Sequence, residues 1–264
     1  QAFSRIEKVS FTQKEQNFLI EKFTSDKVDA SFASSVFRNK NVKKYPNVLP
    51  KNINNKEVKR NYSTFFDSYS KHRTKKFMRR WRTRFKNAEE KYQVDKEAIA
   101  AIILVETGLG SIRGRYSVLS VFASIVVEAT EALKGEVSDV ARYNKKLNWA
   151  TEELHAALEL GKSGQINVVN LKGSRSGAFG MSQFLPSSFQ RWAVDGDGNG
   201  KINLEGPADV IASTANYLKQ HGWVLGIQSP ENRKAVYDYN NSQIYVDTIL
   251  KVAESFTAFD KPKK

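Results

Sequence analysis

Glu106 is the first residue whose type and position suit chemistry. It ends a run of eight apolar residues, 98–105, that covers every side of the helix expected from Asp95 to Gly108. Asp95 is the expected N-cap, and Gly108 supplies the C-terminal stop. A helix that is apolar all round must be buried, and this one is too short to cross a membrane.

A carboxyl in the last turn of that helix meets two effects that favour its protonated form. Burial removes water, and the helix dipole places negative potential at this end, so we expect a raised pKa and a general acid. The alternative is a structural Glu106 that pairs with Arg113 or Arg115.

Residues 174–186 (SRSGAFGMSQFLP) form the second candidate segment. Gly177 and Gly180 lack side chains, which lets the backbone approach a ligand closely. Gln183 offers an amide for hydroxyl or acetamido groups. The alternative is a strand-to-helix turn that only needs small residues.

Residues 195–203 (DGDGNGKIN) match a calcium-binding EF-hand loop, with oxygen ligands at positions 1, 3 and 5 and glycine at position 6. Gly206 stands at position 12, where a bidentate Glu belongs, and Asp209 could close a longer loop. We expect a structural Ca²⁺ and no organic cofactor; the alternative is an Asx-rich turn.

A segment rich in tyrosine and asparagine, 237–242, precedes a helix that contains Tyr245. Such side chains suit sugar binding through ring stacking and amide hydrogen bonds, and the alternative is a capped helix start. Neither His155 nor His221 has the spacing of a metal ligand or a catalytic base.

The elements that must position these residues are mainly helical. Phe11, Phe18 and Leu19 fall near one helical face, and residues 39–61 are expected to be a loop. A short strand is expected at 165–171. Further helices are expected at 65–92, 118–134, 139–160, 186–194, 207–221 and 242–256.

Charge divides the chain at residue 90. Residues 1–90 hold 22 basic and 9 acidic side chains, and the rest hold 20 and 19. Nine Lys or Arg and no acid lie between Lys71 and Lys86, which suggests a polyanionic partner or a solvated helix face. We expect a basic helical accessory region at 1–90 and a catalytic core at 91–264.

Composition excludes other classes. With 40% hydrophobic residues the chain is not disordered, and without cysteine it has no disulfide or thiolate site. No apolar stretch is long enough to span a membrane, and no leader opens the chain, so either the protein is cytosolic or a leader has been removed.

Taken together, these motifs resemble the membrane-bound lytic murein transglycosylase B family, the soluble Slt35-like lytic transglycosylases of the lysozyme-like superfamily. The resemblance runs from about Phe77 to Phe256. It rests on the order and spacing of residues 101–107, 177–188, 195–209, 215–223 and 239–242.

The resemblance implies a mainly helical, α+β lysozyme-like fold. It also implies an enzyme that cleaves the β-1,4 bond between N-acetylmuramic acid and N-acetylglucosamine in peptidoglycan. Glu106 would protonate the leaving oxygen and then act as base on the muramyl 6-hydroxyl, which closes a 1,6-anhydro ring. The substrate would be lined by Ser174, Gln183, Tyr217, Tyr239, Asn240 and Tyr245, and Ca²⁺ would be held by Asp195, Asp197, Asn199, the Lys201 carbonyl and Asp209.

The sequence departs from the family at 124–128, which lacks expected aromatic and proline residues, and at Arg175 and Ser176. One alternative is therefore a lysozyme-like muramidase that hydrolyses modified, de-N-acetylated peptidoglycan. Another is a non-catalytic protein that binds cell wall or nucleic acid. We expect a monomer that is located in the periplasm or secreted to the cell envelope. Its partner would be peptidoglycan strands, to which the basic N-terminal third would hold it, and we expect it to bind no nucleic acid.

Overall fold

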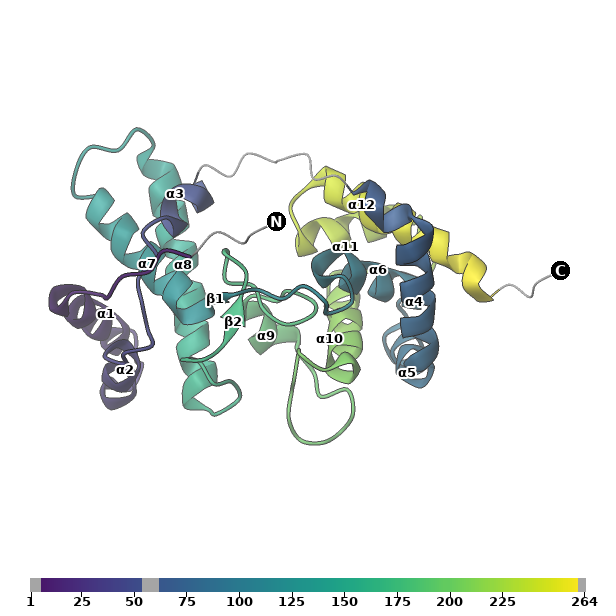
Figure 1. Cartoon of the computed structure of the whole chain (residues 1–264), viewed down its shortest axis with the longest axis horizontal. Coiled ribbons are helices and arrows are strands. Elements are labelled where there is room, and N and C mark those ends of the chain that lie inside the picture. Colours follow the sequence, from purple (N-terminus) through teal and green to yellow (C-terminus); the bar gives the residue numbers. More distant parts are fainter. Residues whose placement is uncertain (1–5, 54–61, 261–264) are drawn as a thin grey trace. The chain divides into compact units, whose positions relative to one another are not determined.

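The computed structural model describes residues 6–53 and 62–260 (Figure 1). These residues form two compact units, each assembled from separate stretches of the chain. The first unit contains residues 6–53, 114–179 and 184–190, and the second contains 62–113, 180–183 and 191–260. The expected division at residue 90 was drawn from charge and not from packing. The accessory role of residues 1–90 and the catalytic role of residues 91–264 stay predictions.

The first unit is built around two long helices, α7 (Val118–Ala132) and α8 (Val140–Lys162), which pack against each other. The shorter helices of this unit are α1 (Gln13–Ser25), α2 (Ala30–Phe37), α3 (Val48–Ile53) and the beginning of α9 (Pro186–Trp192). Its sheet is an antiparallel pair of two-residue strands, β1 (Tyr116–Ser117) and β2 (Lys172–Gly173).

Serine hydroxyls on α7 hold the segment that leads into α3. The Ser120 hydroxyl accepts from the Lys43 amide at 3.1 Å, and the Ser124 hydroxyl accepts from the Tyr45 amide at 2.8 Å. Both serines are fully buried. Ser124, the first residue of the stretch 124–128 that departs from the family, therefore has a packing role, since a small polar side chain satisfies a neighbouring backbone amide.

Two sequence expectations for the first unit were wrong. Residues 39–53 include helix α3 with buried Val48, Leu49 and Ile53, because Pro50 falls in the first turn, where its missing N–H is not needed. The rest of the expected loop, 54–61, lies outside the described residues. The expected strand at 165–171 consists of turns whose amides bond to nearby carbonyls, so the strand begins only at Lys172.

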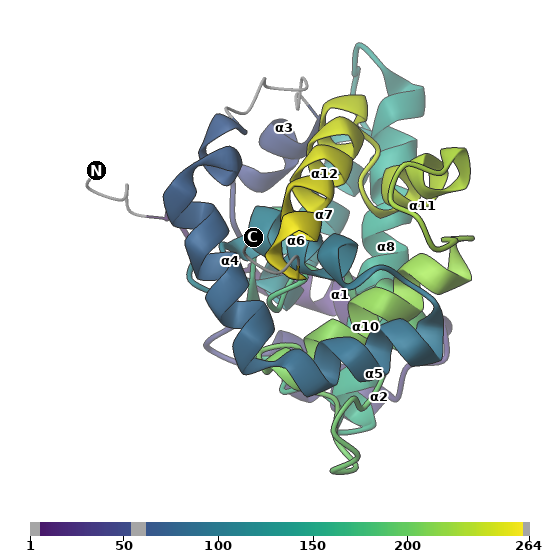
Figure 2. The ribbon, with the colours of Figure 1, turned by 90° about the vertical axis from the view of Figure 1, so that its right-hand side faces the viewer.

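The second unit surrounds helix α6 (Lys96–Thr107), which contacts four other helices. These are α4 (Ser68–Arg80), α5 (Arg82–Tyr92), α10 (Pro207–Gln220) and α12 (Gln243–Phe256), and Figure 2 shows α12 beside α6. The unit also contains α11 (Pro230–Tyr239) and the 3₁₀ turns η1 (Ser63–Phe66) and η2 (Thr257–Asp260).

Helix α6 is as buried as its sequence predicts. Every side chain from Ala98 to Val105 is at most 8% exposed. Gly108 is left-handed (φ 58°), its amide bonds to the Leu104 carbonyl, and the Leu109 amide bonds to the Ile103 carbonyl, so a left-handed glycine ends the helix and its last carbonyls are satisfied.

Asp95 occupies the expected N-cap position, but its side chain does not cap α6. Its carboxylate instead accepts from the Trp223 indole at 2.9 Å and from the Gly226 amide at 3.0 Å. The residue therefore ties the start of α6 to the loop after α10.

The expected helix 65–92 is divided into α4 and α5 by Trp81, whose backbone (φ −106°, ψ 23°) leaves the helical region. The two helices stay in contact across this bend, because the Phe77 and Phe85 rings meet edge to face at 5.9 Å. Helix α11 was not expected, although Ser229-Pro230 is a typical helix start.

Within residues 6–53 and 62–260, none of the helices combines the length and the apolar character that a transmembrane span requires.

Candidate active site

Glu106 lies in the last turn of α6 and is half-buried. The next residue fixes this end of the helix. The Thr107 hydroxyl donates to the Met181 carbonyl at 2.8 Å and accepts from the Gly110 amide at 3.0 Å. A Cβ at Gly110 (φ 82°) would come within 3.0–3.2 Å of the Met181 side chain, so glycine is needed there.

Tyr245, in the first turn of α12, contacts the Glu106 carboxyl directly. Its hydroxyl donates to Glu106 Oε1 at 2.5 Å, and its side chain is only 2% exposed. The Ser242 hydroxyl accepts from the Tyr245 amide at 3.2 Å and so caps the helix that presents the phenol. Burial, together with the negative charge of Glu106, raises the pKa of Tyr245 well above its usual value. The phenol therefore remains a neutral donor to the carboxyl.

Two further tyrosines lie beside this pair. Tyr239 donates to the Ser182 carbonyl at 2.5 Å, and burial followed by the charge of Glu106 raises its pKa well above the usual value. The Tyr217 hydroxyl donates to the Asp238 carbonyl at 2.8 Å, and its ring meets Tyr239 at 4.7 Å and 69°. The structure thus brings together four of the predicted site residues: Glu106, Tyr217, Tyr239 and Tyr245.

Gln183 and Asn240 each follow, in the sequence, one partner of the hydrogen bond between Tyr239 and Ser182. Gln183 has a left-handed backbone (φ 54°) and its side-chain amide donates to the Gly180 carbonyl at 2.9 Å. It directly follows Ser182, which binds Tyr239. Asn240 ends α11 and is exposed.

Ser174 belongs to the first unit, where its hydroxyl organises the turn that contains the predicted glycine motif. It accepts from the Ser176 and Ala178 amides at 3.3 and 3.2 Å. Gly177 (φ 80°) lies against the Phe122 ring, which a Cβ would approach to 2.2 Å. The structure therefore supports the turn interpretation for Gly177, and a close approach of this backbone to a ligand stays a prediction.

The hypothesis that Arg113 neutralises Glu106 is not what the structure shows. Arg113 instead forms an ion pair with Glu205, and its Nε donates to the Gly110 carbonyl at 3.1 Å. Arg115, the other proposed partner, belongs to the first unit.

The sequence analysis missed two aromatic residues at this site. Tyr62 lies near enough to Tyr245 that its charge contributes to the raised pKa of that phenol. His221, taken as an ordinary helix residue, stacks on the Tyr217 ring at 3.9 Å and 11°. The spacing of Tyr217 and His221, four residues apart on one helix, was a signal that could have found this pair.

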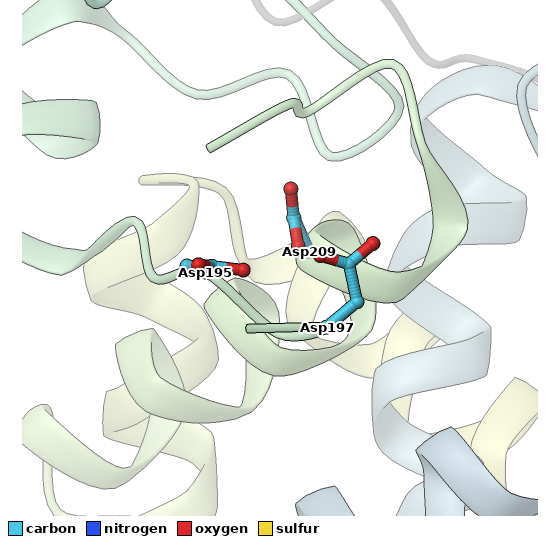
Figure 3. Close-up of side chains that lie close together, drawn as sticks. All are labelled: Asp195, Asp197 and Asp209. Atoms are coloured by element: carbon cyan, nitrogen blue, oxygen red, sulfur yellow. The ribbon is translucent and has the colours of Figure 1, made fainter. Parts of the chain in front are cut away.

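Asp195, Asp197 and Asp209 gather in the second unit, with carboxylate oxygens all within 4.8 Å of one another (Figure 3). Asp209 is 2% exposed and accepts from the Gly196 and Asn203 amides at 2.8 and 2.7 Å. The Gly200 amide, with two neighbouring amides, lowers the pKa of Asp195. No Lys or Arg of the described chain forms an ion pair with these acids.

Three like charges held this close, with one almost fully buried, fit a hard divalent cation with oxygen ligands. Asp209 lies in the first turn of α10, which starts after Gly206, so the chain reaches the cluster three residues later than in a twelve-residue loop. The Asn199 side chain accepts from the Lys201 amide at 2.9 Å within the same loop.

A mainly helical fold with a small antiparallel strand pair, and a carboxyl at the end of a buried helix among tyrosines, defines a protein of the lysozyme-like class. The family model described as "Transglycosylase SLT domain" matches residues 10–230. The chain belongs to this family, as the sequence resemblance predicted.

The chain is also similar to individual proteins of known type. Over 152 residues it is 36% identical to membrane-bound lytic murein transglycosylase B of Escherichia coli (strain K12), a match that spans 58% of this chain and 38% of that protein. The chain thus spans well under half of this relative's length.

Solved structures share the fold. The Escherichia coli lytic transglycosylase Slt35 in complex with calcium has a TM-score of 0.77 and 23% identity, over 92% of each chain. SltB3 of Pseudomonas aeruginosa, in complex with NAG-anhNAM-pentapeptide, has a TM-score of 0.77 and 21% identity, over 93% of this chain and 79% of that one. The predicted lysozyme-like fold is confirmed.

Proposed function

We propose that the chain is a lytic transglycosylase that cleaves the β-1,4 bond between N-acetylmuramic acid and N-acetylglucosamine in peptidoglycan. The observation that carries this proposal is the 2.5 Å hydrogen bond from Tyr245 to Glu106, within a group of tyrosines, in a chain of the transglycosylase family. A relative named as a lytic murein transglycosylase, and the structure of SltB3 bound to a NAG-anhNAM-pentapeptide, support the substrate class.

Glu106 acts twice in the proposed reaction. Its carboxyl first gives a proton to the glycosidic oxygen as the bond to the muramyl C1 breaks. The carboxylate then takes the proton of the muramyl 6-hydroxyl, whose oxygen bonds to C1 and closes the 1,6-anhydro ring. No water is consumed, and Glu106 ends protonated, as it began.

The neighbouring side chains position this carboxyl and the sugar. Tyr245 holds Oε1 and thereby fixes the orientation of the carboxyl group. Together with Ser174, Gln183, Tyr217, Tyr239 and Asn240, we assign it to the substrate contacts. A rigid, partly dry setting strengthens the electrostatic interactions that the developing charge requires.

The aspartate loop binds Ca²⁺ in this proposal, through Asp195, Asp197, Asn199, the Lys201 carbonyl and Asp209. The ion offsets two of the three negative charges of the clustered carboxylates and fixes the start of α10, which carries Tyr217. Its role is structural, and the loop takes no part in the reaction. The substrate assigns the protein to the cell envelope.

The test compares Glu106→Gln with wild type on purified sacculi, with Glu136→Gln, an exposed acid, as the matched control. We expect wild type and the control to release muropeptides with anhydro ends, and Glu106→Gln to lose about 10²–10⁴-fold of the rate. Mass spectrometry distinguishes anhydro from reducing ends by one water. Reducing ends would identify a hydrolase, and equal release by Glu106→Gln would remove the enzymatic function.

A further inference from the structure

A second, basic pocket lies wholly within the first unit. It has a volume of about 150 Å³ and opens between the segment before α3, α3 itself, the start of β1 and the turn after β2. Its lining includes three cationic side chains, Lys51, Arg115 and Arg175, and one acidic side chain, Glu7. These cations come from three separate segments, so the positive charge does not follow from one local run of sequence.

The positive charge of this pocket is only partly balanced by the protein. In the part of the chain that the structure describes, neither Lys51 nor Arg175 forms an ion pair with an acid. Glu7 accepts from the Asn47 side-chain amide at 2.7 Å. Lys51 and Arg175, set against the single carboxylate of the lining, leave an excess of positive charge in a small space, which attracts an anion.

The walls of the pocket are braced by hydrogen bonds. The Asn52 amide donates to the Arg175 carbonyl at 3.4 Å, and the Ser176 hydroxyl donates to Asn52 Oδ1 at 3.3 Å. These contacts tie α3 to the turn that carries Arg175. The site is therefore formed before a ligand arrives, which lowers the entropic cost of binding.

Two tyrosines, Tyr45 and Tyr116, also line the pocket. The Tyr45 hydroxyl accepts from the Ser117 amide at 3.0 Å, and the Tyr45 and Tyr116 rings meet edge to face at 5.2 Å. Tyr45 is 6% exposed, so its ring is fixed in place. The cavity then has room for one small group and not for an extended chain.

We propose that this pocket is an oxyanion-binding site that takes a single carboxylate or phosphate group through Lys51, Arg115 and Arg175. Guanidinium groups match the planar geometry of such anions and bind them by charge-assisted hydrogen bonds. Two sources present this chemistry: a carboxylate of the peptidoglycan peptides, which rests on the proposed function, and free inorganic phosphate, which does not. Arg175 directly follows Ser174, which we assign to the substrate contacts.

Calorimetric titration of the whole chain with two kinds of probe tests the site. The first probe is inorganic phosphate, and the second is an N-acetylmuramyl peptide with free carboxylates, compared with the same peptide fully amidated. We expect saturable binding of at least one free oxyanion in the millimolar range. Lys51→Gln and Arg175→Gln should each weaken it about tenfold, the loss of one charge-assisted contact.

Two further variants separate loss of charge at the site from other effects. Lys172→Gln removes an exposed cation of β2 that does not line the pocket, and it should bind the probe as wild type does. Glu7→Gln keeps an acceptor for Asn47 but removes the competing charge, so it should bind the anion more tightly, a gain that misfolding cannot produce.

The outcomes assign the source and decide the proposal. Binding of phosphate alone supports an inorganic oxyanion site, and preference for the free over the amidated peptide supports a substrate carboxylate. If no free anion binds saturably, or if affinity is the same in wild type, Lys51→Gln and Arg175→Gln, the pocket is not an oxyanion site. Because binding is measured without turnover, this result is independent of whether Glu106 cleaves glycan.

Discussion

Tyr245 and Glu106 are 139 residues apart in the chain, and the phenol oxygen lies 2.5 Å from the carboxylate oxygen. The contact exists because α12 packs against α6, with the last turn of one helix beside the first turn of the other. A charged acceptor makes this bond stronger than a neutral one. Its removal should therefore affect catalysis more than sugar binding.

Tyr245→Phe should lower kcat by about 10–100-fold, the loss of one hydrogen bond to a charged group, and should change KM little. The measurement is steady-state release of muropeptides from sacculi. Tyr143→Phe on α8, outside the tyrosine group, is the matched control and should match wild type. A rise in KM with unchanged kcat would mean that Tyr245 acts only as a sugar contact and does not position Glu106.

The buried tyrosines should be visible in an alkaline titration. Burial is the first cause of the raised pKa in Tyr45, Tyr217, Tyr239 and Tyr245, and the charge of Glu106 adds to it in the last two. These four should ionise at a higher pH than tyrosine ordinarily does when phenolate absorbance is followed in the native protein.

The same pKa shifts give the sign of the stability change. Because the pKa of these phenols is raised in the folded state, their contribution to the free energy of unfolding is complete below about pH 10, the usual tyrosine pKa. That contribution is lost as pH rises through the pKa values of the folded state. Chemical denaturation from pH 8 to 11 should show falling stability. If all tyrosines ionise together while the fold is intact, the four phenols are not buried as described.

Much of the second unit follows from local sequence pattern. The apolar run 98–105 and Gly108 were sufficient to predict a buried helix with Glu106 in its last turn, because burial and a left-handed stop are local signals. The tyrosines could be named from family resemblance. Their hydrogen bonds could not, since they depend on how α12 and α11 pack.

Other features depend on distant partners that no local pattern encodes. The Asp95 side chain binds Trp223, 128 residues away, and this long-range partner replaces the expected capping bond. Tyr62 precedes a short 3₁₀ turn and has no periodic neighbours that would mark it. Helix α3 could not be predicted from the sequence, because Pro50 and several polar residues favoured a loop. Packing against α7 stabilises the helix.

Calcium should stabilise the fold through the aspartate loop. With Ca²⁺ at about 100 times its Kd, the gain in the free energy of unfolding is about 2.7 kcal/mol. Thermal unfolding with Ca²⁺ and with a chelator measures this gain. Asp195→Asn and Asp209→Asn should each remove most of it, because each withdraws one carboxylate from the cluster.

Asp26→Asn, an exposed acid of the first unit, is the control for this experiment and should keep the full calcium response. An equal response in Asp26→Asn, Asp195→Asn and Asp209→Asn would show that calcium acts elsewhere. No calcium response in wild type would leave the loop as an Asx-rich turn.

Glu128 should make the stability of the protein depend on pH near neutrality. It lies on α7 near Lys44, which forms an ion pair with Glu15 at 2.5 Å. Burial raises the pKa of Glu128 to about 7, against the opposing effect of Lys44. Because the folded pKa is raised, the stabilising contribution of its protonated form is complete below about pH 4.5 and is lost as pH rises through 7.

Glu128→Gln is therefore expected to match wild type in stability at pH 4.5 and to exceed it at pH 8. The difference should be about 1–2 kcal/mol, since solvent screening reduces the value that the full shift implies. Urea denaturation at several pH values measures it, with Glu136→Gln as the control that removes an exposed carboxyl. If the free energies of unfolding of Glu128→Gln and wild type change in parallel from pH 4.5 to 8, Glu128 does not bind its proton in the folded state as proposed. Its carboxylate is then stabilised by Lys44 instead.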